Sequence, residues 1–299
     1  MLTGWETLTE IGREQGYLHA LRVVLSRLFL GVRLRLKRLP NTIESNLQIW
    51  SSHDWSEGGE EWSNTPEWKA SVVEHVLKPN VPTGSRVLEI GPGAGRWTEC
   101  LLPRAEHLVV VDVTPVCIEM CKARFKDFGN IDYFINDGRD LSFIPAHSID
   151  RIWSWDVFVH IQSTDIENYV RQFATILAPG GRGVIHHSKS GVSQIGWRSD
   201  MTAQKMVDFC QRYGLDVLQQ FDSWDNGRVR IWPALPADAG PDIVTIFAKP
   251  VQVGRLRRSQ SAPAEPQSSG LNADGSTEPS SRGLRPSSAE GLAAVCGPR

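Results

Sequence analysis

The sequence contains no uninterrupted apolar segment long enough to cross a lipid bilayer, and it opens on Thr-Gly-Trp-Glu-Thr after Met-Leu rather than on a basic and then apolar run. We therefore expect neither a membrane span nor a secretory signal. The chain also has no large excess of positive or negative charge, because it contains 32 Lys and Arg and 34 Asp and Glu residues, with a formal net charge of -2. Without an overall basic field, nucleic acid is not expected as the main partner.

Cysteine is scarce and carries no paired motif. The five cysteines, at positions 100, 117, 121, 210 and 296, include no C-x-x-C pair. Cys117 and Cys121 would share a helix face, but no histidine at ligand spacing accompanies them, so no metal site is predicted. Free cysteine is most often a small buried residue. Buried, reduced thiols indicate a reducing cytoplasm.

Glycine is concentrated at residues 89–95, Glu-Ile-Gly-Pro-Gly-Ala-Gly. The apolar run just before the glycines predicts a buried strand, and the glycines predict a tight turn into a helix. A small-molecule cofactor should lie on this turn, because glycine lets a ligand approach the backbone and the positive end of the helix. The dinucleotide pattern G-x-G-x-x-G would need a small residue at position 96, where this chain has Arg96.

The spacing Glu-x-Gly-x-Gly-x-Gly resembles the first motif of the class I S-adenosylmethionine-dependent methyltransferases. The resemblance extends over about residues 70–250 and includes Leu-x-Pro-Gly-Gly at 177–181. It implies an α/β, Rossmann-like fold, with a seven-stranded, mostly parallel sheet, an antiparallel last strand and helices on both faces. The implied cofactor is S-adenosyl-L-methionine. The alternatives from other classes are an NAD(P)-dependent oxidoreductase, which Arg96 and the lack of a Tyr-x-x-x-Lys pair disfavour, and a non-catalytic Rossmann-like binding protein.

Two acids are expected to hold the methyl donor. Asp112 ends the continuous apolar run 108–111 and lies about twenty residues past the glycine turn, where a carboxylate accepts from ribose hydroxyls in this topology. By resemblance, Asp137 occupies the position of an acid that accepts from the adenine amino group. The residues expected to bind the cofactor are Glu89, Gly91, Gly93, Gly95, Asp112, Asp137, Gly138 and Trp155.

Histidine is the expected general base. Methyl transfer to a hydroxyl requires an aligned acceptor and a group that removes its proton, and histidine has a suitable pKa. His160 follows the predicted fourth strand, and His186 and His187 end the fifth. Because successive strand residues point to opposite faces, at most one of His186 and His187 should face the acceptor. We prefer His160 and His187 for this role, with His53 as the next candidate.

Composition divides the chain into four parts. Residues 1–40 form an N-terminal extension whose basic amphipathic helix at 21–39 could lie on an anionic membrane, mediate self-association or pack on the protein itself. Residues 41–69 are rich in tryptophan and form a candidate lid, or a loop that its tryptophans staple to the domain. Residues 70–250 make up the methyltransferase domain. Residues 251–299, rich in Ser, Pro and Gly, are predicted to be disordered.

Tryptophan and histidine near the predicted pocket favour a particular acceptor. Aromatic faces stack on rings while polar groups fix orientation, so we expect O-methylation of a small-molecule or glycan hydroxyl. Methylation of nitrogen, on a small amine or a protein side chain, is the alternative within the same class. An Asn-Pro-Pro-Tyr-like motif after strand four would have favoured nitrogen, but residues 153–156 read Trp-Ser-Trp-Asp.

Overall fold

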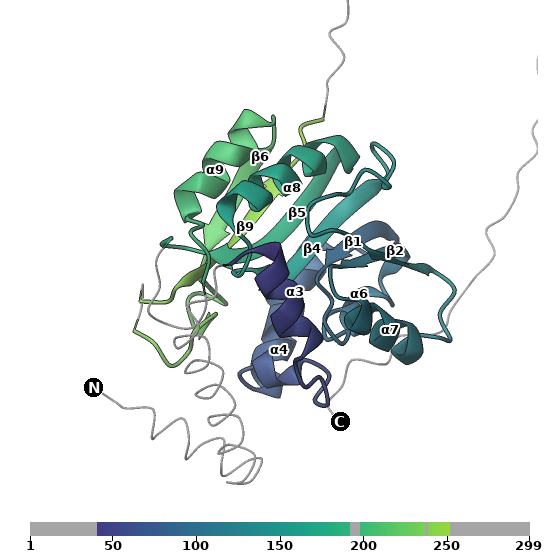
Figure 1. Ribbon diagram of the computed structural model, residues 1–299. Coiled ribbons are helices and arrows are strands. Elements are labelled where there is room, and N and C mark those ends of the chain that lie inside the picture. The colour runs from purple at the N-terminus through teal and green to yellow at the C-terminus, as the bar shows by residue number, and fades with distance from the viewer. Residues whose placement is uncertain (1–40, 192–197, 237–238, 252–299) are drawn as a thin grey trace, which may run out of the picture. The chain divides into compact units, whose positions relative to one another are not determined.

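A computed structural model describes residues 41–191, 198–236 and 239–251, and Figure 1 shows them as a ribbon. All of these residues fall in one compact unit. The predictions made for residues 1–40, with the helix at 21–39, and for the tail beyond Val251 lie outside the described residues.

The centre of the fold is a seven-stranded sheet of order β3-β2-β1-β4-β5-β9-β6. Neighbouring strands from β3 to β5 pair in parallel, whereas β9 is antiparallel to both β5 and β6, which confirms the predicted sheet. The strands are β1 Ser85–Ile90, β2 Ala105–Asp112, β3 Ile131–Ile135, β4 Ile149–Phe158, β5 Leu177–Ser188, β6 Asp216–Phe221 and β9 Asp242–Ala248. A separate two-stranded hairpin joins β7 Ser223–Trp224 to β8 Val229–Arg230.

Helices cover both faces of the sheet, as its continuous apolar strands require. One apolar core lies beneath α4, α6 and α7, and the other lies beneath α8 and α9, which pack together on one side in Figure 1. The helices are α3 Ile43–Ser51, the short 3-10 turn η1 Glu60–Trp62, α4 Pro66–Val72, the π segment η2 Val73–Leu77, α5 Lys78–Asn80, α6 Thr98–Leu101, α7 Pro115–Arg124, α8 Ser163–Ile176 and α9 Ala203–Arg212.

Threonine begins three of these helices. The side chains of Thr42, Thr65 and Thr202 each accept a backbone N–H from the first turn of α3, α4 and α9. The composition of residues 50–68, rich in tryptophan and glycine, predicts an ordered loop, but the helix that Thr42 caps extends to Ser51, and α4 begins at Pro66. The loop prediction is correct for residues 52–59 and 63–65, on either side of η1.

Strand β5 begins earlier than its apolar pattern predicts. The apolar pattern predicts a fifth strand over residues 183–187, but pairing extends back to Leu177 and takes in the Pro-Gly-Gly segment. Lys249, the residue after β9, accounts for part of the extension, since its N–H donates to the carbonyl of Gly181 at 2.9 Å and its carbonyl accepts the N–H of Gly180 at 2.9 Å. Leu177 pairs with Ile149 of β4. Cross-strand hydrogen bonds of this kind are invisible to a local apolar pattern.

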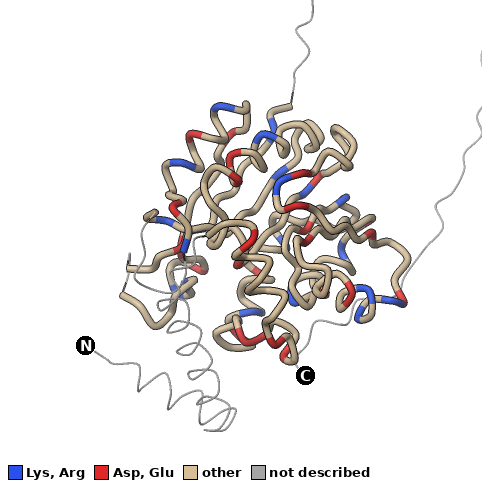
Figure 2. The backbone as a smooth tube through the Cα atoms, viewed as in Figure 1, with Lys and Arg blue, Asp and Glu red and all other residues tan. Residues whose placement is uncertain are grey.

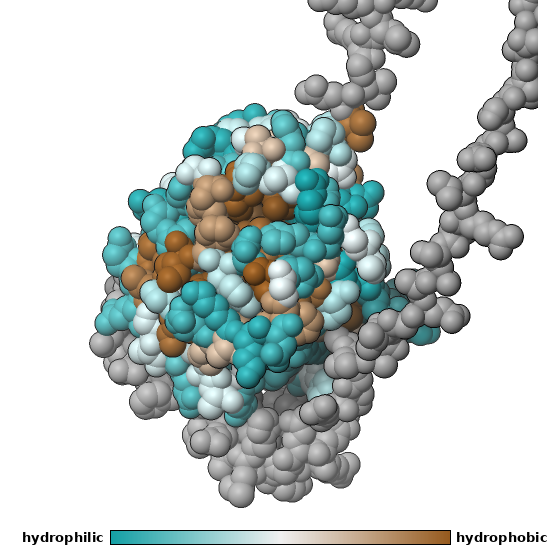
Figure 3. All heavy atoms as spheres, turned by 90° about the vertical axis from the view of Figure 1, so that its right-hand side faces the viewer, coloured by the Kyte–Doolittle hydropathy of each residue, from teal (hydrophilic) through white to brown (hydrophobic). Residues whose placement is uncertain are grey.

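The surface of the described residues mixes charge and apolar character. Acidic and basic residues are interspersed along the tube in Figure 2, in keeping with the small net charge. Apolar patches on the face in Figure 3 are separated by polar residues. Cys100, Cys117, Cys121 and Cys210 are buried thiols outside any disulfide, as predicted, and Cys296 lies outside the described residues. Within the described ranges, no helix is both long and apolar enough to cross a membrane.

Candidate active site

A cavity of about 560 Å³ opens where parallel strands β1 to β4 end. Gly91 follows β1, Asp112 ends β2, Asn136 follows β3, and Asp156 lies near the end of β4, and all four line this cavity. The carboxyl ends of strands in open α/β sheets are where such proteins bind ligands. Residues of α3 and of the tryptophan-rich segment that follows form another part of the wall.

The glycine turn has the backbone that its sequence predicted. Gly91 and Gly93 have φ angles of 72° and 57°, in the left-handed region that favours glycine. A Cβ atom on Gly93 would lie 2.7 Å from the ring of Trp55. The indole N–H of Trp55 donates to the carbonyl of Trp50 at 3.1 Å and so fixes this ring. The segment predicted as a lid therefore lies directly against the turn.

Asp112 lines the cavity at the end of β2 and is 8% exposed. One carboxylate oxygen, Oδ1, accepts the N–H of Thr114 at 2.7 Å. Burial raises the pKa of Asp112 to about 6, and hydrogen bonds from the backbone at Thr114 and Gly93 offset only part of that rise. The carboxylate is thus ionised at neutral pH and can accept further hydrogen bonds from the cavity.

Glu89 lies behind the turn and not in the cavity. Its side chain is 1% exposed and accepts the hydroxyl of Thr98 at 2.7 Å. Burial raises the pKa of Glu89 to about 8, so the group is neutral at pH 7. Gly95 is also absent from the cavity wall, because a Cβ there would meet the ring of Phe125 at 2.6 Å. Glu89 and Gly95, which the sequence placed among the cofactor-binding residues, are therefore packed against other protein residues and do not line the cavity.

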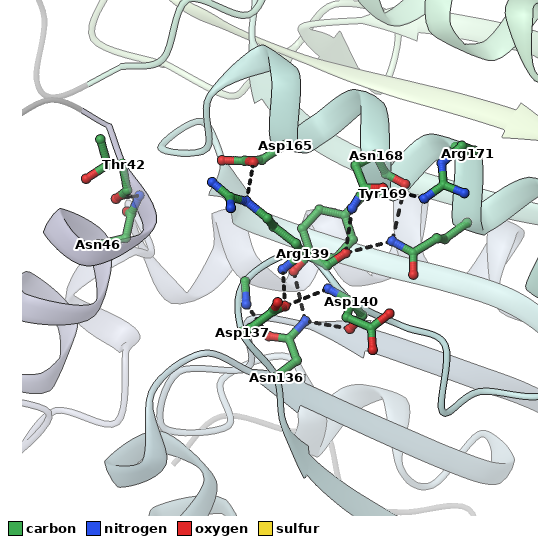
Figure 4. Close-up of polar contacts among 12 residues, drawn as sticks. Thr42, Asn46, Asn136, Asp137, Arg139, Asp140, Asp165, Asn168, Tyr169 and Arg171 are labelled. Carbon is green, nitrogen blue, oxygen red and sulfur yellow. Dashed lines mark hydrogen bonds and ion pairs between the residues drawn. The ribbon is translucent and has the colours of Figure 1, made fainter.

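Asn136 takes the place in the cavity that the sequence suggested for Asp137. The Asp137 carboxylate is exposed and accepts the N–H groups of Arg139 and Asp140 at 2.8 and 2.7 Å, so it caps its own turn (Figure 4). Asn136 lines the cavity, and its amide donates to the hydroxyl of Tyr169 at 3.0 Å. Sequence reasoning missed this residue, because only the acid matches the family pattern.

Gly138 and Trp155 both line the cavity, as expected for cofactor residues. The N–H of Gly138 donates to the side-chain oxygen of Asn136 at 3.1 Å and thereby orients that amide. Trp155 is 3% exposed and lies at the end of β4, with its ring centroid 5.0 Å from that of His186.

The structure separates the four candidate histidines. His160 and His186 line the cavity, whereas His187 and His53 do not. His187 points into the sheet, where Nε2 lies 2.7 Å from the hydroxyl of Thr245 and Nδ1 lies 2.8 Å from the carbonyl of Ser188. Burial lowers the pKa of His187 to about 4, and both ring nitrogens lie within hydrogen-bonding distance of protein atoms, so the geometry does not support the preference for His187 as base.

His53 belongs to an aromatic cluster on the tryptophan-rich segment. Its Nε2 lies 2.8 Å from Glu61 Oε1, and its ring lies 4.6 Å from Trp55 and 5.8 Å from Trp62 between centroids. His160, by contrast, follows β4, where its carbonyl accepts the side-chain amides of Asn41 and Asn46 at 3.1 and 3.0 Å. Its ring lies 5.4 Å from that of Trp50.

A buried chain of charges, which sequence reasoning missed, crosses the cavity wall. Arg96 forms an ion pair with Asp156, and Nδ1 of His186 lies 3.0 Å from the other oxygen of Asp156. On the far side, Arg198 holds Asp242 with two hydrogen bonds of 2.7 and 2.8 Å. Nε2 of His186 lies 3.7 Å from Asp242. These contacts therefore connect the turn before α6 with strands β4, β5 and β9 through side chains that are distant in sequence.

Asp156 is the strained member of this chain. Its φ angle is 64°, which is uncommon outside glycine and costs free energy that the surrounding structure must offset. Burial by itself would raise the pKa of its carboxyl, but the charges and hydrogen bonds of Arg96 and His186 together outweigh burial and hold the pKa well below its usual range. One sequence feature pointed to this ion pair: Arg96 stands at a position where dinucleotide-binding proteins have a small residue.

Comparisons with known proteins agree with this geometry. Residues 87–181 match the family model of a methyltransferase domain. The ubiquinone biosynthesis O-methyltransferase of Xanthomonas axonopodis pv. citri (strain 306) is 26% identical over 111 residues, which cover 37% of this chain and 46% of that protein. The demethylmenaquinone methyltransferase of Tropheryma whipplei (strain Twist) is 31% identical over 105 residues, which cover 35% and 42%.

A solved structure shares the fold. The N-methyltransferase NodS from Bradyrhizobium japonicum WM9, in complex with S-adenosyl-L-homocysteine, superposes with a TM-score of 0.51 at 20% identity and covers 70% of this chain and 98% of that one. The matches to the two curated relatives span less than half the length of each. The family model, the sequence relatives and the fold together show that the chain carries a domain of the class I S-adenosylmethionine-dependent methyltransferase family.

Proposed function

We propose that this protein transfers the methyl group of S-adenosylmethionine to a small-molecule acceptor. The observation that carries the proposal is the buried Asp112 carboxylate, which faces the cavity beside a glycine turn that a Cβ would obstruct. Asp112 would accept the ribose hydroxyls of the donor, Gly91 and Gly93 would admit its tail, and Asn136 would meet its adenine. When bound, the donor supplies an electrophilic methyl group.

We further propose oxygen as the methylated atom. Rings of Trp50, Trp62 and Trp68 line the cavity and provide flat faces for an aromatic acceptor or a sugar. The names of the two curated relatives, which concern ubiquinone and menaquinone, support a ring-shaped small molecule over a protein side chain. Methylation of nitrogen is the second candidate, because the structural neighbour NodS is an N-methyltransferase.

His160 is the proposed general base. It lines the cavity at the end of β4, where an acceptor could approach both it and the donor. His186 is less suited to the role, because its Nδ1 accepts the backbone N–H of Asp156 at 3.1 Å. The same Nδ1 lies 3.0 Å from Oδ1 of Asp156, so contacts with Asp156 occupy this nitrogen.

The test combines donor binding with turnover. S-adenosylhomocysteine should bind the full chain in calorimetry, and turnover should be sought in a panel of phenols, sugars and amines. His160→Gln should keep the donor affinity and lose roughly 100-fold or more in methylation of a hydroxyl acceptor. The matched control is His107→Gln, because His107 is exposed and lies outside the cavity.

Each part of the proposal has its own contrary result. The methyltransferase proposal fails if S-adenosylhomocysteine does not bind. Oxygen as the acceptor atom fails if only amines are methylated. The assignment of His160 fails if His160→Gln methylates a hydroxyl as fast as the wild type.

A further inference from the structure

One wall of the cavity is made by two segments that lie far apart in the sequence. Asn64 and Trp68 come from the segment before β1, and Ile231 and Trp232 come from the segment between β8 and β9. Hydrogen bonds join the two segments. Nε1 of Trp68 donates to the carbonyl of Arg230 at 2.7 Å. Nδ2 of Asn64 donates to the carbonyl of Ile231 at 3.3 Å. We call the four cavity residues, Asn64, Trp68, Ile231 and Trp232, the far wall.

The far wall stands beside β4 and β9. The ring of Trp68 lies 6.1 Å from that of Trp155 on β4, between centroids. The indole N–H of Trp232 donates to Asp242 on β9 at 2.8 Å. In the sheet, β1 separates these strands from β2 and β3, at whose ends the methyl donor is proposed to bind. The tail of the donor is proposed to lie on the glycine turn, to which Arg96 belongs, and the far wall contains no residue of that turn. The far wall is therefore left to the acceptor.

Most hydrogen-bond donors of the far wall are used within the protein. The indole N–H groups of Trp68 and Trp232 both have protein acceptors, and a carbonyl accepts one amide hydrogen of Asn64. Arg198 lies over the Trp232 ring, with its guanidinium carbon 5.4 Å from the centroid, and its Nε and Nη2 are bonded to a carboxylate at 2.7 and 2.8 Å. The far wall therefore offers a ligand mainly the carbon atoms of two indole rings and of Ile231.

A wall of this kind selects against hydroxyl groups. A hydroxyl buried there gives up its hydrogen bonds to water and finds few partners in return, which is unfavourable. An apolar aromatic group has no such loss and gains from burial against flat rings. A sugar carries hydroxyl groups around its ring, so it suits this wall less well than an aromatic ring with one hydroxyl and an apolar body.

We propose that the acceptor is a phenol whose apolar body lies against the far wall. Its hydroxyl points toward the donor and toward His160, the proposed base, which follows β4 and lines the same cavity. This inference rests on the proposed function, because it names the substrate class of the same cavity. Among the acceptors expected from the sequence, it selects a small-molecule hydroxyl over a glycan hydroxyl.

The probes are para-ethylphenol and para-hydroxybenzyl alcohol, which differ only where a methyl group of the first is a hydroxyl in the second. Each is titrated by calorimetry into the full chain, with and without saturating S-adenosylhomocysteine, and methyl glucoside serves as the sugar probe. We expect para-ethylphenol to bind at least about tenfold more tightly than para-hydroxybenzyl alcohol, and methyl glucoside not to bind at concentrations below about 10 mM.

A matched pair of variants places the phenol on the far wall. Ile231→Thr adds a hydroxyl to the wall and keeps a β-branched side chain, and it should reduce the ratio of the two phenol affinities to below about threefold. Val229→Thr adds a hydroxyl two residues away, at a residue that does not line the cavity, and should leave the ratio unchanged. A general loss of stability would lower both affinities and leave their ratio as it is.

Four results would overturn the inference. They are no binding of para-ethylphenol, binding of para-hydroxybenzyl alcohol at least as tight, binding of methyl glucoside as tight as that of the phenol, and equal ratios in Ile231→Thr and Val229→Thr. The donor is judged separately. If S-adenosylhomocysteine does not bind but para-ethylphenol binds the chain with the expected ratio, the inference about the far wall stands and the proposed donor falls.

Discussion

Donor affinity should depend on pH through Asp112. Its pKa of about 6 means that roughly one carboxyl in ten is ionised at pH 5 and nearly all are ionised at pH 8. The ribose hydroxyls of the donor need the ionised form as their acceptor. The affinity for S-adenosylhomocysteine should therefore be about tenfold lower at pH 5 than at pH 8. Asp112→Asn should bind the ligand weakly and without this pH dependence.

Stability should change in the opposite direction. The ordinary pKa of this carboxyl is 3.8, so between that value and about 6 the folded protein binds more protons than the unfolded chain does. The stability that Asp112 contributes at low pH is therefore lost as pH rises through about 6. A shift of about two units corresponds to at most about 3 kcal/mol. Asp112→Asn should unfold at a higher temperature than the wild type at pH 7.5.

The assay is calorimetric titration of S-adenosylhomocysteine at four pH values from 5 to 8, with thermal unfolding of the unliganded proteins alongside. The matched control is Asp132→Asn, because Asp132 is exposed on β3 and pairs with His107 outside the cavity. The reasoning about Asp112 is refuted if the wild-type affinity does not change with pH, or if Asp112→Asn keeps the same pH dependence. A lower unfolding temperature for Asp112→Asn would refute the argument about burial.

Three further predictions concern Glu89, Gly183 and Asp137. Glu89→Gln should change the free energy of unfolding by less than about 1 kcal/mol, since the buried carboxyl is neutral at pH 7, whereas Glu89→Ala should cost roughly 2–3 kcal/mol; chemical denaturation distinguishes them. Gly183→Ala should cost about 1–3 kcal/mol, because its Cβ would lie 2.2 Å from the ring of Phe247, while Gly129→Ala, in open space, should be neutral by the same measurement. Asp137→Asn should leave affinity for S-adenosylhomocysteine within about twofold by calorimetry, because this exposed side chain caps its own turn; a tenfold loss would restore Asp137 as an adenine contact.

Much of the fold follows from local patterns. Continuous apolar runs ended by glycine or acid located the parallel strands, because strands buried on both faces need no polar alternation. The glycine turn and Asp112 were also identifiable, since their roles depend on a backbone conformation and on a position at a strand end. Nothing in a local pattern indicated that α3 would begin at Ile43 or that β5 would extend back to Leu177.

The sequence alone determined the class of fold, the place of the glycine turn and the acid beside it, because backbone preference and apolar periodicity act over neighbouring residues. Only the tertiary structure decided which polar side chains meet in the cavity. Arg96 and Asp156 are 60 residues apart, and the sheet brings them together. Strand alternation limited His186 and His187 to opposite faces, but only the packing of β9 against β5 shows that His187 is enclosed and His186 faces the cavity.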